Sequence, residues 1–201
     1  QKLTATFEAV GTKNACGNSN HFEVDPIVVK RLDNKYILAD SISKQFISCI
    51  YDYISDFSEN LAIVKRNDKY GYIDKSGREV VPCSYDHANK FSDGLACVAK
   101  GKWGYIDKTG AEIIPLSYDG ASDFINGIAS VAKGYYWAII NKAGNIIGSF
   151  EYHTINWFEI YSEGFDFEVN LITVEKNNLL GAIDKTGKKV IPCIYDRLLL
   201  Y

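Results

Sequence analysis

The sequence lacks several features that mark particular classes of protein. It has no Met, only 4 Pro, and no run of apolar residues that approaches the length of a membrane-spanning helix. Its net charge is -3, and the basic residues do not gather into a run or a stripe. A protein that binds the phosphate backbone needs such a basic surface. We therefore expect no membrane span and no nucleic-acid partner.

Cysteine is also sparse and irregularly placed. The chain has 5 Cys, and no two of them show the Cys-x-x-Cys spacing of zinc or redox sites. The odd number argues against a fully paired disulfide framework. Because the sequence starts at Gln1 and contains no Met, we expect a processed or trimmed chain, and loss of a signal peptide is one origin that fits. The sequence does not identify the cellular compartment, and export is the one that it favours.

What the sequence does contain is a repeat. A motif at residues 102–110, Lys-Trp-Gly-Tyr-Ile-Asp-Lys-Thr-Gly, recurs at 69–77 with small changes and at 180–187 in shortened form. The turn residue of the motif recurs at steps of 34, 33, 34 and 43 residues, as Asp40, Asp74, Asp107, Asn141 and Asp184. A period of this length predicts a repeat architecture.

Each repeat holds three stretches that are typical of β-strands. In the third repeat, residues 95–100 and 102–107 alternate in polarity, and residues 112–115 follow an Asp-Lys-Thr-Gly turn. Such a turn favours a hairpin, because Asp can bond nearby backbone N–H groups and Gly accepts a positive φ. No stretch shows a sustained helical period.

We therefore predict an all-β fold. About five three-stranded antiparallel units should stack as an elongated, solenoid-like array in which each unit depends on its neighbours. A closed five-bladed β-propeller is the alternative. We favour the open array, because propeller blades usually have four strands and about forty residues or more.

The predicted organisation is a single domain over residues 1–201. Residues 1–21 should form an N-terminal strand and loop, with the strand at 2–10 capping an exposed sheet edge. The repeat units are expected at 22–52, 57–86, 91–119, 124–153 and 165–196, and an insertion falls within 154–169.

The third repeat resembles the repeat of the bacterial WG-repeat family. The resemblance is carried by Trp103-Gly104, the turn that follows this pair, and the closing Tyr118-Asp119. The resemblance covers about residues 22–196. It is looser in the other repeats, which have Tyr70-Gly71, Trp137-Ala138 and Leu180-Gly181 at the named pair. The resemblance implies a general β-scaffold, often exported or fused to other domains, without a shared catalytic site.

Four recurring positions have a structural and a functional interpretation, and we favour the structural one at each. The Gly of the aromatic-Gly pair should allow close packing, although such a pair could also hold a ligand. The turn acids should cap turns rather than bind calcium, since Asn141 replaces one of them. The closing tyrosines should bury their rings and bond between units. A buried apolar position is predicted for Cys49, Cys83 and Cys193, because Leu116 occupies it in another repeat.

The insertion is the main departure from the repeat. Insertions in repeat proteins map to loops on one face, and that face is often the binding face. This one is aromatic and acidic, which suits a basic peptide or a sugar. A longer edge hairpin whose aromatics cover the end of the array is an equal alternative. The candidate ligand-binding residues are Trp157, Phe158, Tyr161, Glu163, Phe165 and Phe167.

Sequence motifs for catalysis are missing. There is no G-x-S-x-G, P-loop or G-x-G-x-x-G motif, and His21, His87 and His153 lie in different parts of the chain. We expect a non-catalytic module that binds a protein or peptide, with no metal and no cofactor. A carbohydrate-binding module with exposed Trp and Tyr is the first alternative, and a hydrolase with an unrecognised site is the second.

Overall fold

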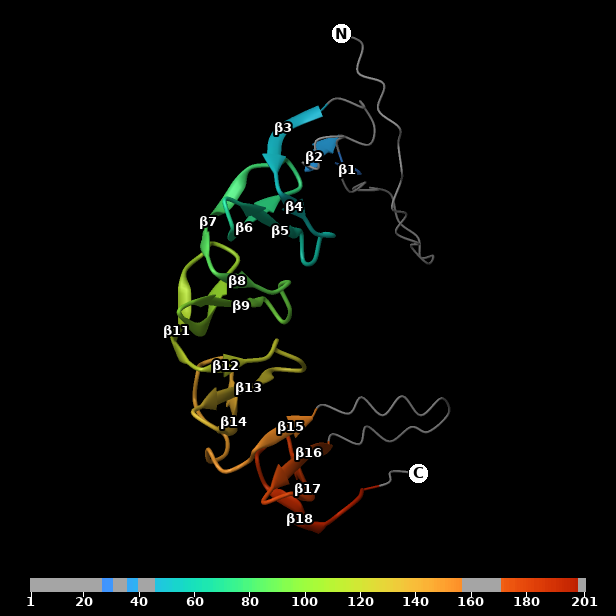
Figure 1. Ribbon diagram of the computed structural model, residues 1–201, viewed down its shortest axis with the longest axis vertical. Coiled ribbons are helices and arrows are strands. Elements are labelled where there is room, and N and C mark those ends of the chain that lie inside the picture. Colours follow the sequence, from blue (N-terminus) through green and yellow to red (C-terminus); the bar gives the residue numbers. More distant parts are fainter. Residues whose placement is uncertain (1–26, 31–35, 40–45, 157–170, 199–201) are drawn as a thin grey trace.

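The computed structural model describes residues 27–30, 36–39, 46–156 and 171–198. All regular secondary structure in these ranges is β, arranged as five small antiparallel sheets that follow one another in chain order (Figure 1). This confirms the predicted all-β class. The predicted N-terminal strand and loop at 1–21 lie outside the described residues.

The strands are short and regular. The first sheet contains β1 (Ile27–Lys30), β2 (Tyr36–Ala39) and β3 (Phe46–Tyr51). The second contains β4 (Tyr53–Ile54), β5 (Leu61–Arg66), β6 (Lys69–Asp74) and β7 (Glu79–Tyr85). The third contains β8 (His87–Ala88), β9 (Leu95–Lys100), β10 (Lys102–Asp107) and β11 (Glu112–Tyr118). The fourth contains β12 (Gly120–Ala121), β13 (Ile128–Lys133) and β14 (Tyr136–Asn141). The fifth contains β15 (Thr154–Asn156), β16 (Leu171–Lys176), β17 (Leu179–Asp184) and β18 (Lys189–Tyr195).

The prediction of three-stranded units is wrong for the second, third and fifth sheets, which have four strands each. The additional strand follows the pair that closes the preceding repeat, which is Tyr-Asp before β4 and β8 and Tyr152-His153 before β15. In the third sheet it is β8, which pairs with β9 through His87↔Ala99 and Ala88↔Val98. A strand of two residues is too short to show an alternation of polar and apolar residues, so the sequence pattern does not indicate it.

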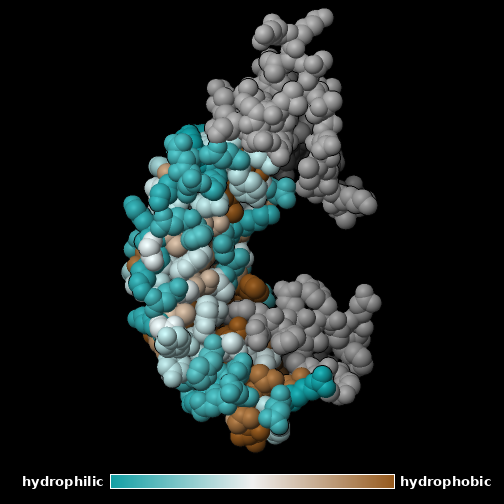
Figure 2. Space-filling view, viewed as in Figure 1, coloured by the Kyte–Doolittle hydropathy of each residue, from teal (hydrophilic) through white to brown (hydrophobic). Residues whose placement is uncertain are grey.

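The five sheets lie along an arc, with β1–β3 near one end and β15–β18 at the other (Figure 1). β7 and β11 lie on the convex side. The connections between the first and second strands of the second, third and fourth sheets point toward the concave side. The convex side, along the left of Figure 2, carries many hydrophilic residues.

The hydrophobic core is divided among the interfaces between consecutive sheets. Four clusters of buried residues each combine side chains from two neighbouring sheets. In one cluster, Tyr72 and Val81 of the second sheet meet Phe91 and Ile106 of the third. Each inner sheet therefore buries both of its faces, and neither face would be covered if the sheet stood alone.

Two buried tyrosines link consecutive sheets by both packing and hydrogen bonding. The ring of Tyr72 meets Phe91 edge-on at 4.9 Å, and its hydroxyl donates to the Asn89 carbonyl at 2.7 Å. Tyr105 repeats the arrangement one sheet later, with its ring 4.7 Å from Phe124 and its hydroxyl 2.8 Å from the Ser122 carbonyl. Burial raises the pKa of both phenols, so the hydroxyls remain donors.

The closing tyrosines behave as predicted at most positions. Tyr51, Tyr118 and Tyr152 are buried, and the Tyr51 hydroxyl donates to the Glu79 carboxylate of the next sheet at 3.2 Å. The Cys position differs from the prediction, because Cys83 and Cys193 are half buried rather than buried. Each packs on the edge of an inter-sheet cluster.

The turn acids form turns, as predicted. The Asp107 carboxylate accepts hydrogen bonds from the backbone N–H groups of Thr109 at 2.8 Å and Ala111 at 3.0 Å, while Gly110 takes a φ of 87°. Asn141 accepts the equivalent pair of bonds, both at 3.0 Å. The hydrogen bond from the Thr109 side chain is the main cause that lowers the pKa of Asp107.

The Gly of the aromatic-Gly pair is required for close packing. The pairing between β10 and β11 shifts between Trp103↔Tyr118 and Tyr105↔Ile114, so β11 bulges across Gly104. A Cβ at Gly104 would lie 2.6 Å from the Ile114 oxygen and 2.8 Å from the Leu116 nitrogen. The packing interpretation of this glycine is therefore confirmed.

The fourth repeat shows what happens without that Gly. Ala138 takes its place, and the fourth sheet has three strands. Residues 145–152 form no strand ladder with β14, and they pair with it through the isolated bridges Trp137↔Tyr152 and Ile140↔Ile146 and a hydrogen bond from the Ile147 N–H to the Ile139 carbonyl at 2.8 Å. An Ala Cβ cannot fit beneath a closely bulged strand, which accounts for the loosened pairing.

Glu151 ties the fourth repeat to the fifth sheet. Its carboxylate lies 2.5 Å from Lys176 Nζ and 3.2 Å from Lys189 Nζ. The hydrogen bond from Lys176 is the largest of the effects that lower the pKa of Glu151, to about 2. Two strands of the fifth sheet therefore share one acid from the preceding repeat.

We expect Gly104→Ala to lower the free energy of unfolding by about 1–3 kcal/mol, because β11 must move away to make room for the methyl group. Urea denaturation followed by circular dichroism measures this change. Gly148→Ala is the matched control, since a Cβ there would meet nothing within 4 Å. Equal midpoints for the two variants would contradict the close-packing account.

We expect Glu151→Gln to destabilise the chain at neutral pH but not near pH 2. The folded pKa of about 2 lies below the ordinary value of 4.5, so ionised Glu151 stabilises the folded state above pH 4.5. That stabilisation is lost as the pH falls through this window. Urea midpoints of both proteins at several pH values should converge toward pH 2, and a constant difference would show that the charge is not the cause.

Candidate binding surface

The sequence-predicted ligand residues all fall in segment 157–170, which lies outside the described residues. The structure therefore does not show whether Trp157, Phe158, Tyr161, Glu163, Phe165 and Phe167 come together. The place of the segment in the fold is nevertheless defined. It connects β15, which ends at Asn156, to β16, which begins at Leu171.

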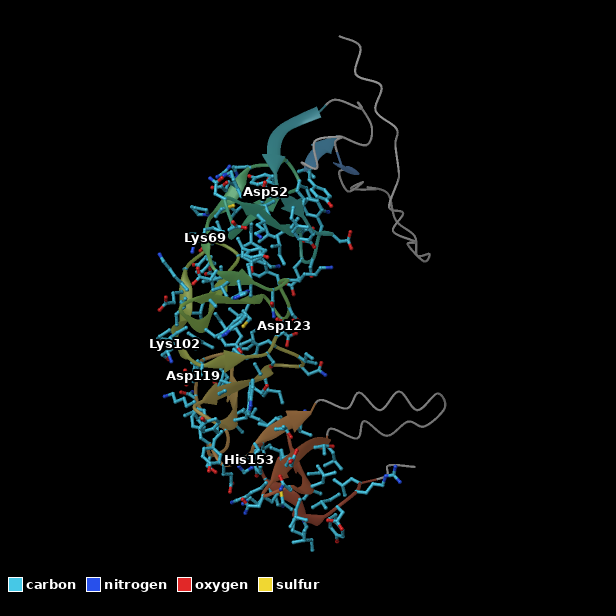
Figure 3. The ribbon with its side chains drawn as sticks, viewed as in Figure 1. Asp52, Lys69, Lys102, Asp119, Asp123 and His153 are labelled. Carbon is cyan, nitrogen blue, oxygen red and sulfur yellow. The ribbon has the colours of Figure 1, made fainter. Side chains whose placement is uncertain are left out.

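Three described loops make the equivalent connection in other sheets. They are residues 55–60 between β4 and β5, 89–94 between β8 and β9, and 122–127 between β12 and β13. Figure 1 shows these loops along the concave side of the arc, and Asp123 of the third loop is labelled there in Figure 3. We call the three loops the concave loop edge. The insertion thus lengthens a connection whose equivalents line one side of the molecule.

Each loop is held to the core by one Phe and ends in a tight turn. Phe91 and Phe124 are buried, and Phe57 is half buried. In the second loop, Asp93 and Gly94 take φ values of 54° and 81°, and Ser92 bridges to Leu95. Two consecutive residues of positive φ are typical of the tight turns that join antiparallel strands.

Hydrogen bonds also join each loop to the next one. The Ser58 hydroxyl donates to the Phe91 carbonyl at 2.8 Å, and the Gly94 N–H donates to the Glu59 carboxylate at 3.2 Å. The same two contacts recur one sheet later. There the Ser92 hydroxyl donates to the Phe124 carbonyl at 2.7 Å, and the Gly127 N–H donates to Asp93 at 2.7 Å. The concave loop edge is therefore a continuous, braced surface.

The sequence contains the signal for this bracing. Ser and an acid recur together at Ser58-Glu59 and Ser92-Asp93, followed by a residue of positive φ. No alternation or motif in the sequence reveals, however, that the partner of each pair lies in the neighbouring repeat. A further contact of this kind joins the Asn89 amide to the Asp123 carboxylate at 2.9 Å.

The concave loop edge carries more acids than bases. Its acids are Asp56, Glu59, Asp93 and Asp123, and its one Lys is Lys90, 3.8 Å from Asp56. Partial burial opposes ionisation of Glu59, but hydrogen bonds from Lys108 and from the Gly94 N–H hold its pKa below the ordinary value. The side chain of Asp56 is 64% exposed. The edge can thus present negative charge to a ligand.

The aromatic residues of the repeat motif form a second surface feature. The His87 ring lies between Tyr70, at 6.5 Å and 21°, and Trp103, at 5.6 Å and 15°. These near-parallel rings stack on one another, so their faces are used within the protein. Trp137 packs against Gly120 and is half buried. Sugar binding needs a row of coplanar, exposed rings, and this group of stacked rings does not provide one.

The closing Asp pairs with the Lys of the motif on the convex side (Figure 3). Asp86 accepts from the Gly101 N–H at 2.8 Å and pairs with Lys69 at 2.5 Å. Asp119 accepts from the Gly134 N–H at 2.8 Å and pairs with Lys102. These bonds fix the hairpin of the following sheet, which explains why Lys-Trp-Gly and Tyr-Asp occur together.

At the next junction both partners change. Tyr136 replaces the Lys and His153 replaces the Asp, with their ring centroids 5.2 Å apart. His153 still bonds to the hairpin of the following sheet, because its Nδ1 accepts a hydrogen bond from the Asn177 N–H at 3.3 Å. The histidine thus has a structural place in the repeat.

Within the described ranges, no three His, Cys, Asp or Glu residues are grouped so that they could hold a metal ion. His87 and His153 both lie in ring contacts, and His21 is outside these ranges. In the same part of the chain, no helix has the length and apolar character needed to cross a bilayer.

Comparisons with solved structures find only modest similarity. The Hsv2 protein of Kluyveromyces lactis with loop 6CD replaced by a Gly-Ser linker matches with a TM-score of 0.47 and 10% identity, over 81% of this chain and 61% of that one. BamB from Moraxella catarrhalis matches with a TM-score of 0.43 and 11% identity, over 83% and 60%. The computationally designed Ika4 protein matches with a TM-score of 0.37 and 15% identity, over 60% and 87%. The chain thus spans about 60% of the length of the Hsv2 and BamB structures.

No curated protein sequence matches significantly. The family model described as "WG containing repeat" matches residues 39–70, 70–102, 103–137 and 181–199, which together make up more than half of the chain. These ranges contain the aromatic-Gly pairs, the Asp turns and the closing Tyr-Asp pairs whose contacts are described above. The chain therefore belongs to the WG-containing-repeat family.

Proposed function

We propose that this protein is a non-catalytic module that binds an extended, basic peptide segment of a partner protein. The binding surface is the concave loop edge together with the insertion within 154–169, which lies in the connection between β15 and β16. One observation carries the proposal. The long aromatic and acidic connection between β15 and β16 is the equivalent of three loops that are braced side by side along the concave side.

The bracing supports a role in binding. Loops that are already fixed lose little conformational entropy when a ligand binds. Function in repeat proteins is usually found on loops carried by a rigid scaffold. The acids of the concave loop edge and those of the insertion have the same sign, so a cationic ligand would be favoured along the whole edge.

The stacked rings of Tyr70, His87 and Trp103 count against the carbohydrate alternative, because their faces are occupied. That alternative now depends on the aromatics of the insertion. Against a hydrolase, the two described histidines, His87 and His153, lie against aromatic rings, which is not the setting of a catalytic base. Peptide binding is therefore our first proposal and sugar binding our second.

We further propose that the array is open rather than closed into a ring. Its first and last sheets lie at the two ends of an arc (Figure 1). The four-stranded sheets remove one of the arguments against a propeller, so the arc itself is the support for an open form. An open form leaves the concave side accessible to an extended ligand.

The test is a peptide array and a glycan array probed with the full chain. We expect binding to Lys- and Arg-rich peptides, weakened by added salt and lost in the Trp157→Ala/Phe165→Ala double variant. Tyr135→Ala is the matched control, because Tyr135 is 88% exposed on the β13–β14 hairpin, away from the concave loop edge. Binding to glycans alone would favour the carbohydrate alternative, and equal peptide binding by the double variant would exclude the insertion as the site.

A further inference from the structure

The fifth sheet has a face that no other described sheet covers. On the equivalent face of earlier sheets, the closing tyrosines Tyr51, Tyr118 and Tyr152 are 3%, 7% and 3% exposed, and Tyr85 is half buried. Tyr195 holds the same place in the fifth sheet and is 45% exposed. The hydrophobic group near β18 at the lower end of Figure 2 lies at this end of the array. Within the described ranges, no sheet thus occupies the surface that a following sheet would cover.

The polar contact of this interface is also unused. Asp86 and Asp119 each accept a backbone N–H from the hairpin of the following sheet, at 2.8 Å in both cases. Asp196 stands at their position, directly after Tyr195, and is exposed. Among the described contacts it has neither a hydrogen bond nor an ion pair. The fifth sheet therefore retains both the ring and the acceptor that hold a next sheet elsewhere.

The first sheet carries the matching pattern at the other end of the chain. In the second sheet, Ala62 pairs with Ile73 and Val64 with Gly71, and Ala62, Val64 and Ile73 fill the core shared with the first sheet. In the first sheet, Ile27 pairs with Ala39 and Val29 with Ile37. By register, Ile27, Val29 and Ala39 thus hold the positions of Ala62, Val64 and Ile73. All six are aliphatic, as this side of the interface requires.

We infer that a second copy of this chain seats its first sheet on the open face of the fifth sheet. The contact is head to tail, and it continues an interface that the chain already makes four times within itself. A head-to-tail contact uses different surfaces on the two copies, so it leads to rings or to linear assemblies. The partner at this face is a WG-repeat sheet, not a peptide, so the inference is independent of the concave loop edge.

Sedimentation velocity of the full chain over a wide concentration range tests the inference. We expect the mean mass to rise above that of the monomer with concentration. Tyr195→Ser and Asp196→Ala should each weaken association by about tenfold. The first removes the ring that the contact between copies would bury, and the second removes the hydrogen-bond acceptor. Ile113→Ser is the matched control, since Ile113 is 44% exposed in the middle of the array.

The control should associate like the unchanged chain. The Asp196→Ala variant keeps the test valid if Tyr195→Ser fails to fold, because Asp196 is exposed and Ala removes only its carboxylate. A chain that stays monomeric at every concentration would overturn the inference. So would association that is unaltered in both variants, or weakened equally by Ile113→Ser.

Discussion

The structure depends on the packing of one small sheet against the next. Each of the four cores is shared between two sheets, and the tyrosine contacts repeat this dependence in hydrogen-bonded form. Tyr72 and Tyr105 place a ring and a hydroxyl in the following sheet, while Asp86 and Asp119 fix its hairpin. Stability is therefore a property of neighbouring pairs, as in other repeat arrays. An end of the array that lacks a neighbour leaves apolar and polar groups without these partners.

The family motif has a physical explanation in this packing. The Gly of the aromatic-Gly pair allows the bulged fourth strand to approach more closely than a Cβ would permit. The aromatic residue before this Gly packs on the first strand of the same sheet, as Trp103 does on His87. The Asp-Lys-Thr-Gly turn closes the hairpin, and the Tyr-Asp pair joins one repeat to the next. The fourth repeat shows that these parts are coupled. Its Ala138 accompanies a loosened fourth strand, and its Tyr136 and His153 change together.

Much of this fold could be predicted from the sequence, because the main strands alternate and the Asp turns use local chemistry. The short strands such as His87–Ala88 could not, since two residues carry no periodicity. The bracing of the concave loop edge was missed for a different reason. Ser58 and Glu59 bond to residues more than thirty positions away, and only the stacking of repeats brings these partners together. The predicted ligand residues of the insertion remain a prediction, while the loops equivalent to it are now located.

Small-angle X-ray scattering, extrapolated to low concentration, tests the open array most directly. A compact chain of this length has a radius of gyration of about 17 Å. An open arc of neighbour-stabilised sheets predicts a clearly larger value and an elongated distance distribution. A value near the compact figure, with a distance distribution that shows a closed ring, would contradict the open array and an accessible concave side.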